Sequence, residues 1–331
     1  MTGKQCDGYR ALQFGLLAFI VRREFKLAFL EERRGLISIW ELDKEDVNSI
    51  LDAAAELRRK PRPQGMNGAV MASLFFEPST RTRLSFETAQ YRLGGSVVGF
   101  TNARASSVSK GESLADTIRT VAGYSDVIVM RHPLEGAARW ASEVTDVPII
   151  NGGDGSNQHP TQTLLDLFTI REHRGDLIDL KIGFLGDLRY GRTVHSLVEA
   201  LKHYRAEFRF IAPRELQIPR RYLDDLEDSG LKYELADQPS ASVGGLDVLY
   251  VTRIQKERLG DEVEYERFKG CYRVDEPLLE KNADMAVMHP LPRVDELDPS
   301  VDSRDQCIYF EQAANGIPIR QALLLAATGR W

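Results

Sequence analysis

Two threonines and two arginines in a row, at the junction of an expected strand and an expected helix, form the most informative group in the sequence. Residues 69–76 are a continuous apolar run of the kind that forms a buried strand. Ser79 follows at a position suited to a helix N-cap, and a partly apolar helix then runs to Gly94. Its first residues supply hydroxyl and guanidinium donors and are Thr80, Arg81, Thr82 and Arg83. Because free backbone N–H groups at a helix start also favour anions, the turn is predicted to bind a phosphate.

The relative strengths of these donors favour Arg81 as the main phosphate ligand. A helix dipole contributes about 0.3–1 kcal/mol at an exposed site. A charge-assisted hydrogen bond from a guanidinium contributes about 1.5–3 kcal/mol. For an isolated motif, a surface helix with solvated arginines is an equal alternative. Further motifs along the chain shift the balance toward a phosphate site.

The overall charge excludes some classes of partner. The 331 residues carry 43 basic and 49 acidic side chains, a net charge of −6, which argues against nucleic-acid binding because such proteins usually have a basic excess. An anion site on this chain must be a local basic cluster. The three cysteines are far apart and form no metal-ligand pattern, so we expect no metal site and a reducing, cytoplasmic compartment.

Residues 1–35 are interpreted as an N-terminal extension of unknown role. Residues 11–21 form an apolar run of eleven residues, which is too short to span a bilayer. Arg22, Arg23 and Glu24 follow in place of the small residues of a signal-peptide cleavage site, so export is not favoured. We therefore expect no membrane attachment, and interpret the segment as an extra helix or the product of an upstream start.

Strands and helices alternate through the rest of the chain, which predicts an α/β fold with two doubly wound parallel-sheet domains. The expected strands are residues 69–76, 96–100, 126–130, 148–150, 181–186, 207–212, 232–235, 247–252 and 286–288. Residues 151–160 are expected to form a loop, and residues 238–245 are too rich in Gly and Ser to predict a helix. The first domain is placed at residues 36–174 and the second at residues 175–308, with a helix in residues 309–331 packing back on the first.

Basic residues follow the expected strands in both halves. The loops concerned begin at Ser79, Arg131, His159, Gly186, Thr252 and His289. Ligands of open parallel sheets bind beyond the carboxyl ends of the strands. Since packing does not explain an arginine or histidine at so many strand ends, we expect an active site in the cleft between the two domains.

The motifs FxEPSTRTR, MRHP, HPTQ, GDLRYGRT, TRxQxER and HPLPR, in this order, resemble those of the aspartate carbamoyltransferases. The resemblance runs from Leu36 to Trp331. The S-T-R-T and H-P-x-Q elements are shared by the wider transcarbamoylase family. Pro290 differs from the cysteine of ornithine carbamoyltransferases. The resemblance implies transfer of a carbamoyl group from carbamoyl phosphate to the amine of L-aspartate, in pyrimidine biosynthesis, without a cofactor.

The resemblance also assigns a role to each marked loop. The expected phosphate ligands are Ser79, Thr80, Arg81 and Thr82. The expected donors to the carbonyl oxygen are Thr82, Arg131 and His159. The expected acceptors for the carbamoyl NH2 are Gln162 and the carbonyls of Pro290 and Leu291. The expected aspartate ligands are Lys110, Arg192, Arg253 and Gln255, and those from a neighbouring subunit are Ser106 and Lys110. The expected catalytic residues are Arg81, Thr82, Arg131 and His159.

A shared site implies a homotrimer, to which regulatory chains or a dihydroorotase could bind. The alternatives are a transcarbamoylase for another amino acid and a non-catalytic scaffold that binds carbamoyl phosphate. Arg253 and Gln255 suit an acceptor with a side-chain carboxylate, which favours aspartate. A nicotinamide enzyme is disfavoured because G-x-G-x-x-G is missing. Glu77 is expected to orient an arginine, either Arg192 or Arg258.

Overall fold

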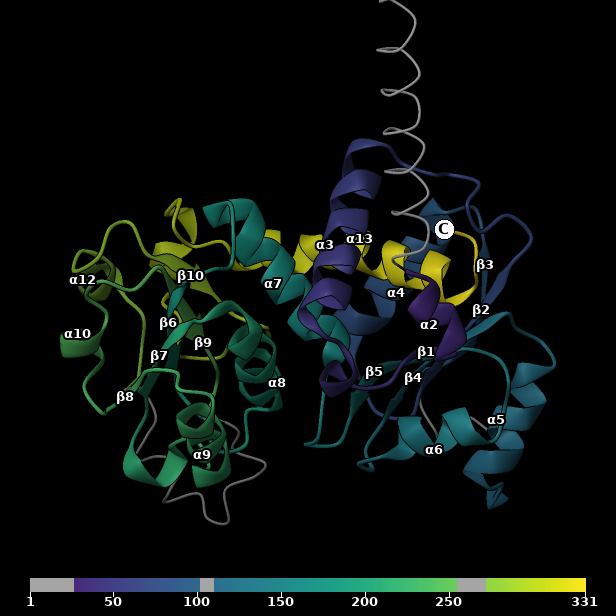
Figure 1. Cartoon of the computed structure of the whole chain (residues 1–331), viewed down its shortest axis with the longest axis horizontal. Coiled ribbons are helices and arrows are strands. Elements are labelled where there is room, and N and C mark those ends of the chain that lie inside the picture. The colour runs from purple at the N-terminus through teal and green to yellow at the C-terminus, as the bar shows by residue number, and fades with distance from the viewer. Residues whose placement is uncertain (1–26, 102–109, 255–271) are drawn as a thin grey trace, which may run out of the picture.

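The computed structural model describes residues 27–101, 110–254 and 272–331, which form two α/β lobes (Figure 1). Each lobe contains one five-stranded parallel sheet, with strand order β1-β5-β4-β2-β3 in the first and β10-β9-β6-β7-β8 in the second. The strands of the first sheet are β1 (Gly35–Leu36), β2 (Val70–Phe75), β3 (Ser96–Phe100), β4 (Val127–His132) and β5 (Ile149–Asp154). The strands of the second are β6 (Lys181–Leu185), β7 (Glu207–Ile211), β8 (Tyr233–Ala236), β9 (Val248–Val251) and β10 (Ala286–Met288). The predicted pair of parallel sheets is therefore confirmed.

Helices connect the strands in both lobes. In the first lobe they are α2 (Ala28–Glu32), η1 (Ile39–Glu41), α3 (Lys44–Arg59), α4 (Thr80–Arg92), α5 (Leu114–Ala122) and α6 (Ala137–Glu143). In the second they are α8 (Arg192–Leu201), η4 (Lys202–Tyr204), η5 (Arg214–Leu216), α9 (Arg220–Asp228), α10 (Pro239–Ser242), α12 (Glu276–Leu279) and η7 (Pro299–Ser303). In the described part of the chain, no helix is both long and apolar enough to cross a membrane.

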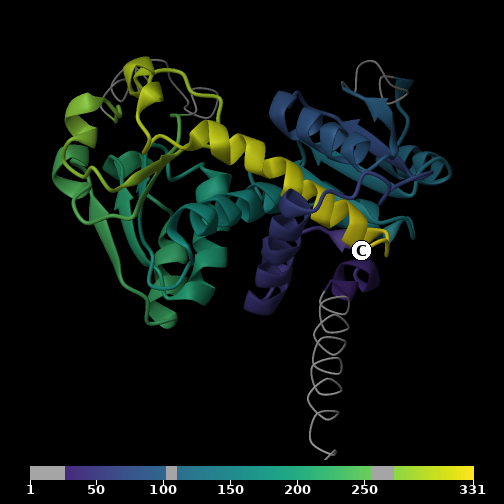
Figure 2. The ribbon, with the colours of Figure 1, turned by 90° about the horizontal axis from the view of Figure 1, so that it is seen from above.

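Two long helices link the lobes, α7 (Pro160–Arg174) and α13 (Tyr309–Ala327). Figure 2 shows α13 running from the second lobe across to the first, where it packs against α3 and α4 as well as α7. One apolar cluster continues through this junction and includes Phe86, Phe168, Phe184 and Leu323. The two lobes therefore share one continuous apolar core at their junction.

The central strands are buried on both faces, as expected of a parallel sheet covered by helices. Val127, Ile128, Val129 and Met130 of β4 are all fully buried. Their side chains alternate between the cluster under α13 and a second cluster under α5 and α6. This packing on both faces fixes the position of β4 in the sheet, and with it the position of Arg131 near the carboxyl end of this strand.

Two local predictions are wrong. Strand β5 continues to Asp154, although residues 151–160 were expected to form a loop, because Asn151 and Asp154 pair with β4. The Asn151 amide nitrogen also donates to the Ile37 carbonyl at 2.9 Å, which satisfies a polar side chain inside the sheet. A short helix, α10, occurs within residues 238–245, and the Ser242 hydroxyl donates to the Gln238 carbonyl at 2.7 Å.

Candidate active site

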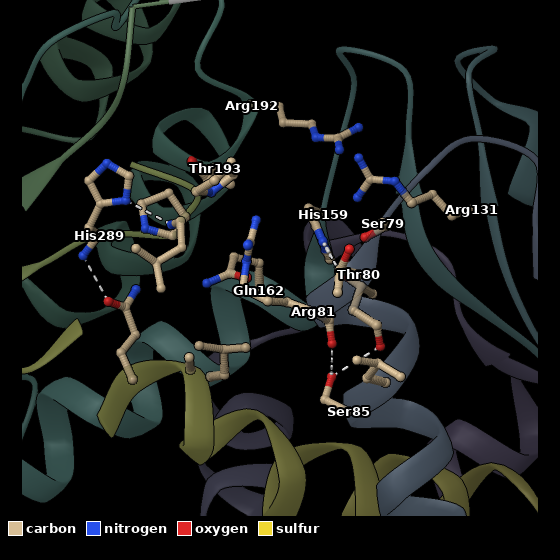
Figure 3. A pocket seen from close by; sticks show the side chains of 18 of the residues that line it. Ser79, Thr80, Arg81, Ser85, Arg131, His159, Gln162, Arg192, Thr193 and His289 are labelled. Carbon is tan, nitrogen blue, oxygen red and sulfur yellow. Dashed lines mark hydrogen bonds between the residues drawn. The ribbon is translucent and has the colours of Figure 1, made fainter. Parts of the chain in front are cut away.

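A cavity of about 930 Å³ is lined by loops from both lobes and by the helices that link them (Figure 3). The predicted site residues that line it are Ser79, Thr80, Arg81, Thr82, Arg131, His159, Gln162, Arg192, Arg253, Pro290 and Leu291. Lys110 is exposed and does not line the cavity of its own chain. Ser106 and Gln255 lie outside the described residues. Arg83 does not line the cavity either, because it turns back to form an ion pair with Glu87 at 3.2 Å.

Three helices begin at this cavity, and all three lack the usual features of a satisfied N-terminus. Helices α4, α7 and α8 have no acidic residue in the first turn and no side-chain hydrogen bond at the N-cap. Helix α3, in contrast, has a complete capping box from Asp43 and Asp46. Ser79 does occupy the predicted N-cap position of α4, but its side chain makes no capping bond. The N–H groups and positive dipole ends of three helices therefore face one space that suits an anion.

Glu77 holds two of the predicted arginines in place. The Arg131 Nε donates to Glu77 Oε1 at 2.7 Å, and Arg192 approaches the same oxygen at 4.0 Å. Arg192 also donates to the Gly155 carbonyl. The predicted partner of Glu77 was Arg192 or Arg258, and the contact with Arg192 is found. The shorter contact, with Arg131, was not predicted, and Arg258 lies outside the described residues.

His159 is a buried neutral donor at the edge of this cluster. Its side chain is 5 % exposed, and its Nε2 lies 3.3 Å from the Thr82 hydroxyl. Burial holds the pKa of His159 well below its usual value, and the charges of Arg192, Arg131 and Arg320 lower this pKa further. A neutral imidazole can donate one N–H to a developing negative charge without itself taking up a proton at neutral pH.

Positive charge dominates the cavity. Among the described residues that line it, Glu77 is the one carboxylate, against Arg81, Arg131, Arg192, Arg253 and Arg320. Burial lowers the pKa of Arg81, and the neighbouring charge of Arg131 lowers this pKa further. Because the two guanidinium groups repel each other, an anion between them would relieve an unfavourable arrangement.

A buried carboxylate behind the cavity was not predicted from the sequence. Asp166 of α7 is 0 % exposed, and it accepts hydrogen bonds from Gln162, Gln312 and Tyr250. Burial raises the pKa of Asp166 to about 7, against the opposing effects of these three donors and of Arg320. The one clue in the sequence is a charged residue within the apolar run LLDLF of a helix.

The segment after β10 is shaped by His289. The Nδ1 of His289 accepts from the Leu291 backbone N–H at 2.7 Å, so its Nε2 carries the proton and donates to Glu296 Oε1 at 2.7 Å. Leu291 has a φ of 56°, a conformation that costs a non-glycine residue about 1–3 kcal/mol. The hydrogen bond to His289 holds this turn at the cavity wall.

Among the described residues, no three His, Cys, Asp or Glu side chains come together in a way that could bind a metal ion. The described residues that line the cavity supply guanidinium, imidazole, amide and hydroxyl donors and backbone carbonyl acceptors. These groups can neutralise an anion and stabilise an oxyanion, and they come from both lobes. The fold and the cavity together define a two-lobed α/β protein with an arginine-rich cleft to which both lobes contribute.

Comparison with known proteins identifies the family. Residues 34–172 match the carbamoyl-phosphate-binding domain of aspartate/ornithine carbamoyltransferases, and residues 178–327 match the Asp/Orn-binding domain. The chain belongs to the aspartate/ornithine carbamoyltransferase family. Proteins named aspartate carbamoyltransferase catalytic subunit are similar to it. The one from Thermococcus gammatolerans is 55% identical over 297 residues, covering 88% of this chain and 96% of the relative. The one from Chromobacterium violaceum is 51% identical over 293 residues, covering 88% of this chain and 97% of the relative.

Solved structures agree with this assignment. The catalytic subunit of aspartate transcarbamoylase from M. jannaschii has a TM-score of 0.84 at 51% identity, covering 88% of this chain and 97% of that one. Aspartate transcarbamoylase from Trypanosoma cruzi, in complex with carbamoyl phosphate and aspartate, has a TM-score of 0.83 at 38% identity, covering 88% of this chain and 96% of that one.

Proposed function

We propose that this chain transfers the carbamoyl group of carbamoyl phosphate to the amine of L-aspartate, giving N-carbamoyl-L-aspartate and phosphate for pyrimidine biosynthesis. The observation that carries the proposal is the single cavity in which three uncapped helix starts meet five arginines. Both substrates are small anions, and the reaction brings their charges together. A relative from Trypanosoma cruzi has been solved in complex with both of these substrates.

The phosphate is assigned to the start of α4. Ser79, Thr80, Arg81 and Thr82 present hydroxyl, guanidinium and backbone donors there. The carbonyl oxygen is assigned to Thr82, Arg131 and His159, of which Thr82 and His159 lie 3.3 Å apart. A good donor to a developing oxyanion contributes about 2.7–4 kcal/mol to catalysis. The NH2 group is assigned to Gln162 and to the carbonyls of Pro290 and Leu291.

Aspartate is assigned to the second lobe. Arg192 and Arg253 line the cavity on that side, and Gln255 belongs to the same motif. The amine attacks the carbonyl carbon, a C–N bond forms, and the bond from carbon to the phosphate oxygen breaks. The departing phosphate keeps the electron pair and can accept the proton that the amine loses. No protein nucleophile is required, so most of the rate enhancement comes from positioning, which can supply about 7–11 kcal/mol.

The decisive assay measures N-carbamoyl-aspartate formation by purified protein, with other amino acids offered in place of aspartate. We expect aspartate to be the preferred acceptor. An Arg83→Met variant, which loses a positive charge on α4 outside the cavity, should keep this activity, because Arg83 pairs with Glu87 and does not line the cavity. No product at saturating substrates, or preference for another acceptor, would overturn the proposal.

We further propose a homotrimer in which Ser106 and Lys110 act in a neighbouring site, with the enzyme in the cytoplasm. The exposure of Lys110, which does not line its own cavity, supports this arrangement. Mixed oligomers of Arg81→Ala and Lys110→Ala chains should recover part of the activity, because one type of site would then be intact. Mixed oligomers verified by mass that remain inactive would refute the shared site.

A further inference from the structure

Asp166 lies where the two lobes and the C-terminal helix meet. It is on α7, one turn beyond Gln162, and its side chain is 0 % exposed. Its three hydrogen-bond donors come from three different elements: Gln162 from α7, Tyr250 from β9 and Gln312 from α13. A buried carboxylate is costly unless it is paired, and Asp166 has these donors and the charge of Arg320.

The contact with Asp166 sets the orientation of the Gln162 amide. Gln162 Nε2 donates to Asp166 Oδ1 at 2.9 Å. The amide nitrogen is therefore directed at the carboxylate, and the amide oxygen is left to accept hydrogen bonds from elsewhere. Gln162 lines the cavity and stands at its centre in Figure 3.

A second connection runs from Asp166 to the segment after β10. Gln312 Nε2 donates to Asp166 Oδ1 at 2.6 Å. The Gln312 Oε1 accepts from the His289 backbone N–H at 2.8 Å. His289 in turn accepts from the Leu291 N–H. The same carboxylate thus supports Gln162 and the turn that carries the Pro290 and Leu291 carbonyls.

We propose that Asp166 is a positioning residue that makes the cavity selective for an acyl group bearing N–H donors. It does so by holding the Gln162 oxygen and the Pro290–Leu291 turn as hydrogen-bond acceptors. The proposal rests on the assigned carbamoyl transfer, because it names the part of the site that recognises the NH2 group of the donor. An acyl phosphate with a methyl group at that position leaves these acceptors without a partner.

The test compares two stable ligands that differ at this position. Phosphonoacetamide carries the NH2 group, and acetonylphosphonate carries a methyl group in its place. Calorimetry with the full chain should show tighter binding of the amide. Asp166→Leu should reduce that preference about tenfold, the loss of one well-made hydrogen bond. Asp166→Asn keeps an oxygen that accepts from Gln162 and should keep most of the preference.

Two further variants separate positioning from general damage. Gln162→Met should lose the same preference as Asp166→Leu, and the double variant should lose no more than either, because the two residues act as a unit. If Asp166→Leu does not fold, Gln312→Met breaks only the second connection and should lower the preference in the same direction.

Equal weakening of both ligands in Asp166→Leu, or a parent protein that binds the two ligands alike, would overturn the inference. The proposed reaction is judged separately. It fails if the parent protein forms no N-carbamoyl-aspartate, whereas the inference is decided by ligand preference in a binding measurement.

Discussion

Replacing Arg81 with methionine is the sharpest test of the cationic cavity. Arg81 lies in the first turn of α4 and lines the cavity beside Arg131. A charge-assisted hydrogen bond contributes about 1.5–3 kcal/mol. Because an affinity changes exponentially with free energy divided by RT (about 0.59 kcal/mol), the expected loss of affinity for phosphonoacetamide is about 10- to 160-fold.

The same substitution should not weaken the ligand-free protein. Burial and the charge of Arg131 both lower the pKa of Arg81, which means that its positive charge is unfavourable in the empty cavity. Methionine keeps a similar length of apolar chain and removes that charge. The thermal midpoint of the ligand-free variant should therefore equal or exceed that of the parent protein.

The assay is calorimetry of phosphonoacetamide binding, with thermal unfolding measured on the same samples. Arg83→Met is the matched control, since Arg83 forms an i,i+4 ion pair with Glu87 at 3.2 Å and does not line the cavity. The pair is partly buried, and an i,i+4 helix pair contributes about 0.3–0.5 kcal/mol to stability. Because Arg83 lies away from the cavity, the control should bind the ligand nearly as the parent does. Unchanged affinity in Arg81→Met, or an equal loss in both variants, would refute the assignment. A lower midpoint for ligand-free Arg81→Met would refute the repulsion argument.

Three further predictions concern catalysis, pH and backbone geometry. His159→Ala should lower kcat by about 100- to 1000-fold in a steady-state assay, since it removes one oxyanion donor; an unchanged kcat would contradict this role. Burial lowers the pKa of His195 to about 4, so as the pH falls below 6.5 the unfolded chain binds a proton at this residue before the folded chain does. The contribution of His195 to the free energy of unfolding, which is complete above pH 6.5, should therefore decline by about 1.4 kcal/mol per pH unit. Urea unfolding of His195→Gln at pH 6.5 and 4.5 should lack that part of the slope, and an equal slope in parent and variant would contradict it. Gly186→Ala should destabilise the chain far more than Gly230→Ala in chemical denaturation. Both glycines have a positive φ, +116 and +66, but the added Cβ at Gly186 meets the Thr252 carbonyl at 2.1 Å, whereas at Gly230 nothing lies within 4 Å. Equal effects of the two substitutions would refute this argument.

The local chemistry of the loops could be predicted because it depends on neighbours in the sequence. Ser79 through Thr82 follow an apolar run and begin a helix, and both facts are visible in a few consecutive residues. Arg131 and His159 were found for the same reason, as basic residues at the ends of apolar strands. The alternation of strands and helices then placed these ends at one edge of each sheet.

Other features depended on contacts between distant parts of the chain. The extension of β5 to Asp154 arises from pairing with β4, while the local sequence NGGD indicates a turn. Glu77 was expected to contact Arg192 or Arg258, and it does approach Arg192 at 4.0 Å, but its short hydrogen bond is with Arg131, which was not expected. The packing of β2 beside β4 brings the end of β2 next to Arg131, and no local feature of the sequence shows this pairing.

The sequence by itself determined the family, the two parallel sheets and the basic and hydroxyl side chains at the strand ends that line the cavity, because these follow from short motifs and from hydrophobic patterning. Only the tertiary structure decided how Asp166 is used. Its partner Gln312 lies 146 positions away in the chain, and Tyr250 comes from the other lobe. Hydrogen bonding and burial depend on distance in space, and these three side chains come together because α7 packs against α13 at the junction of the two lobes.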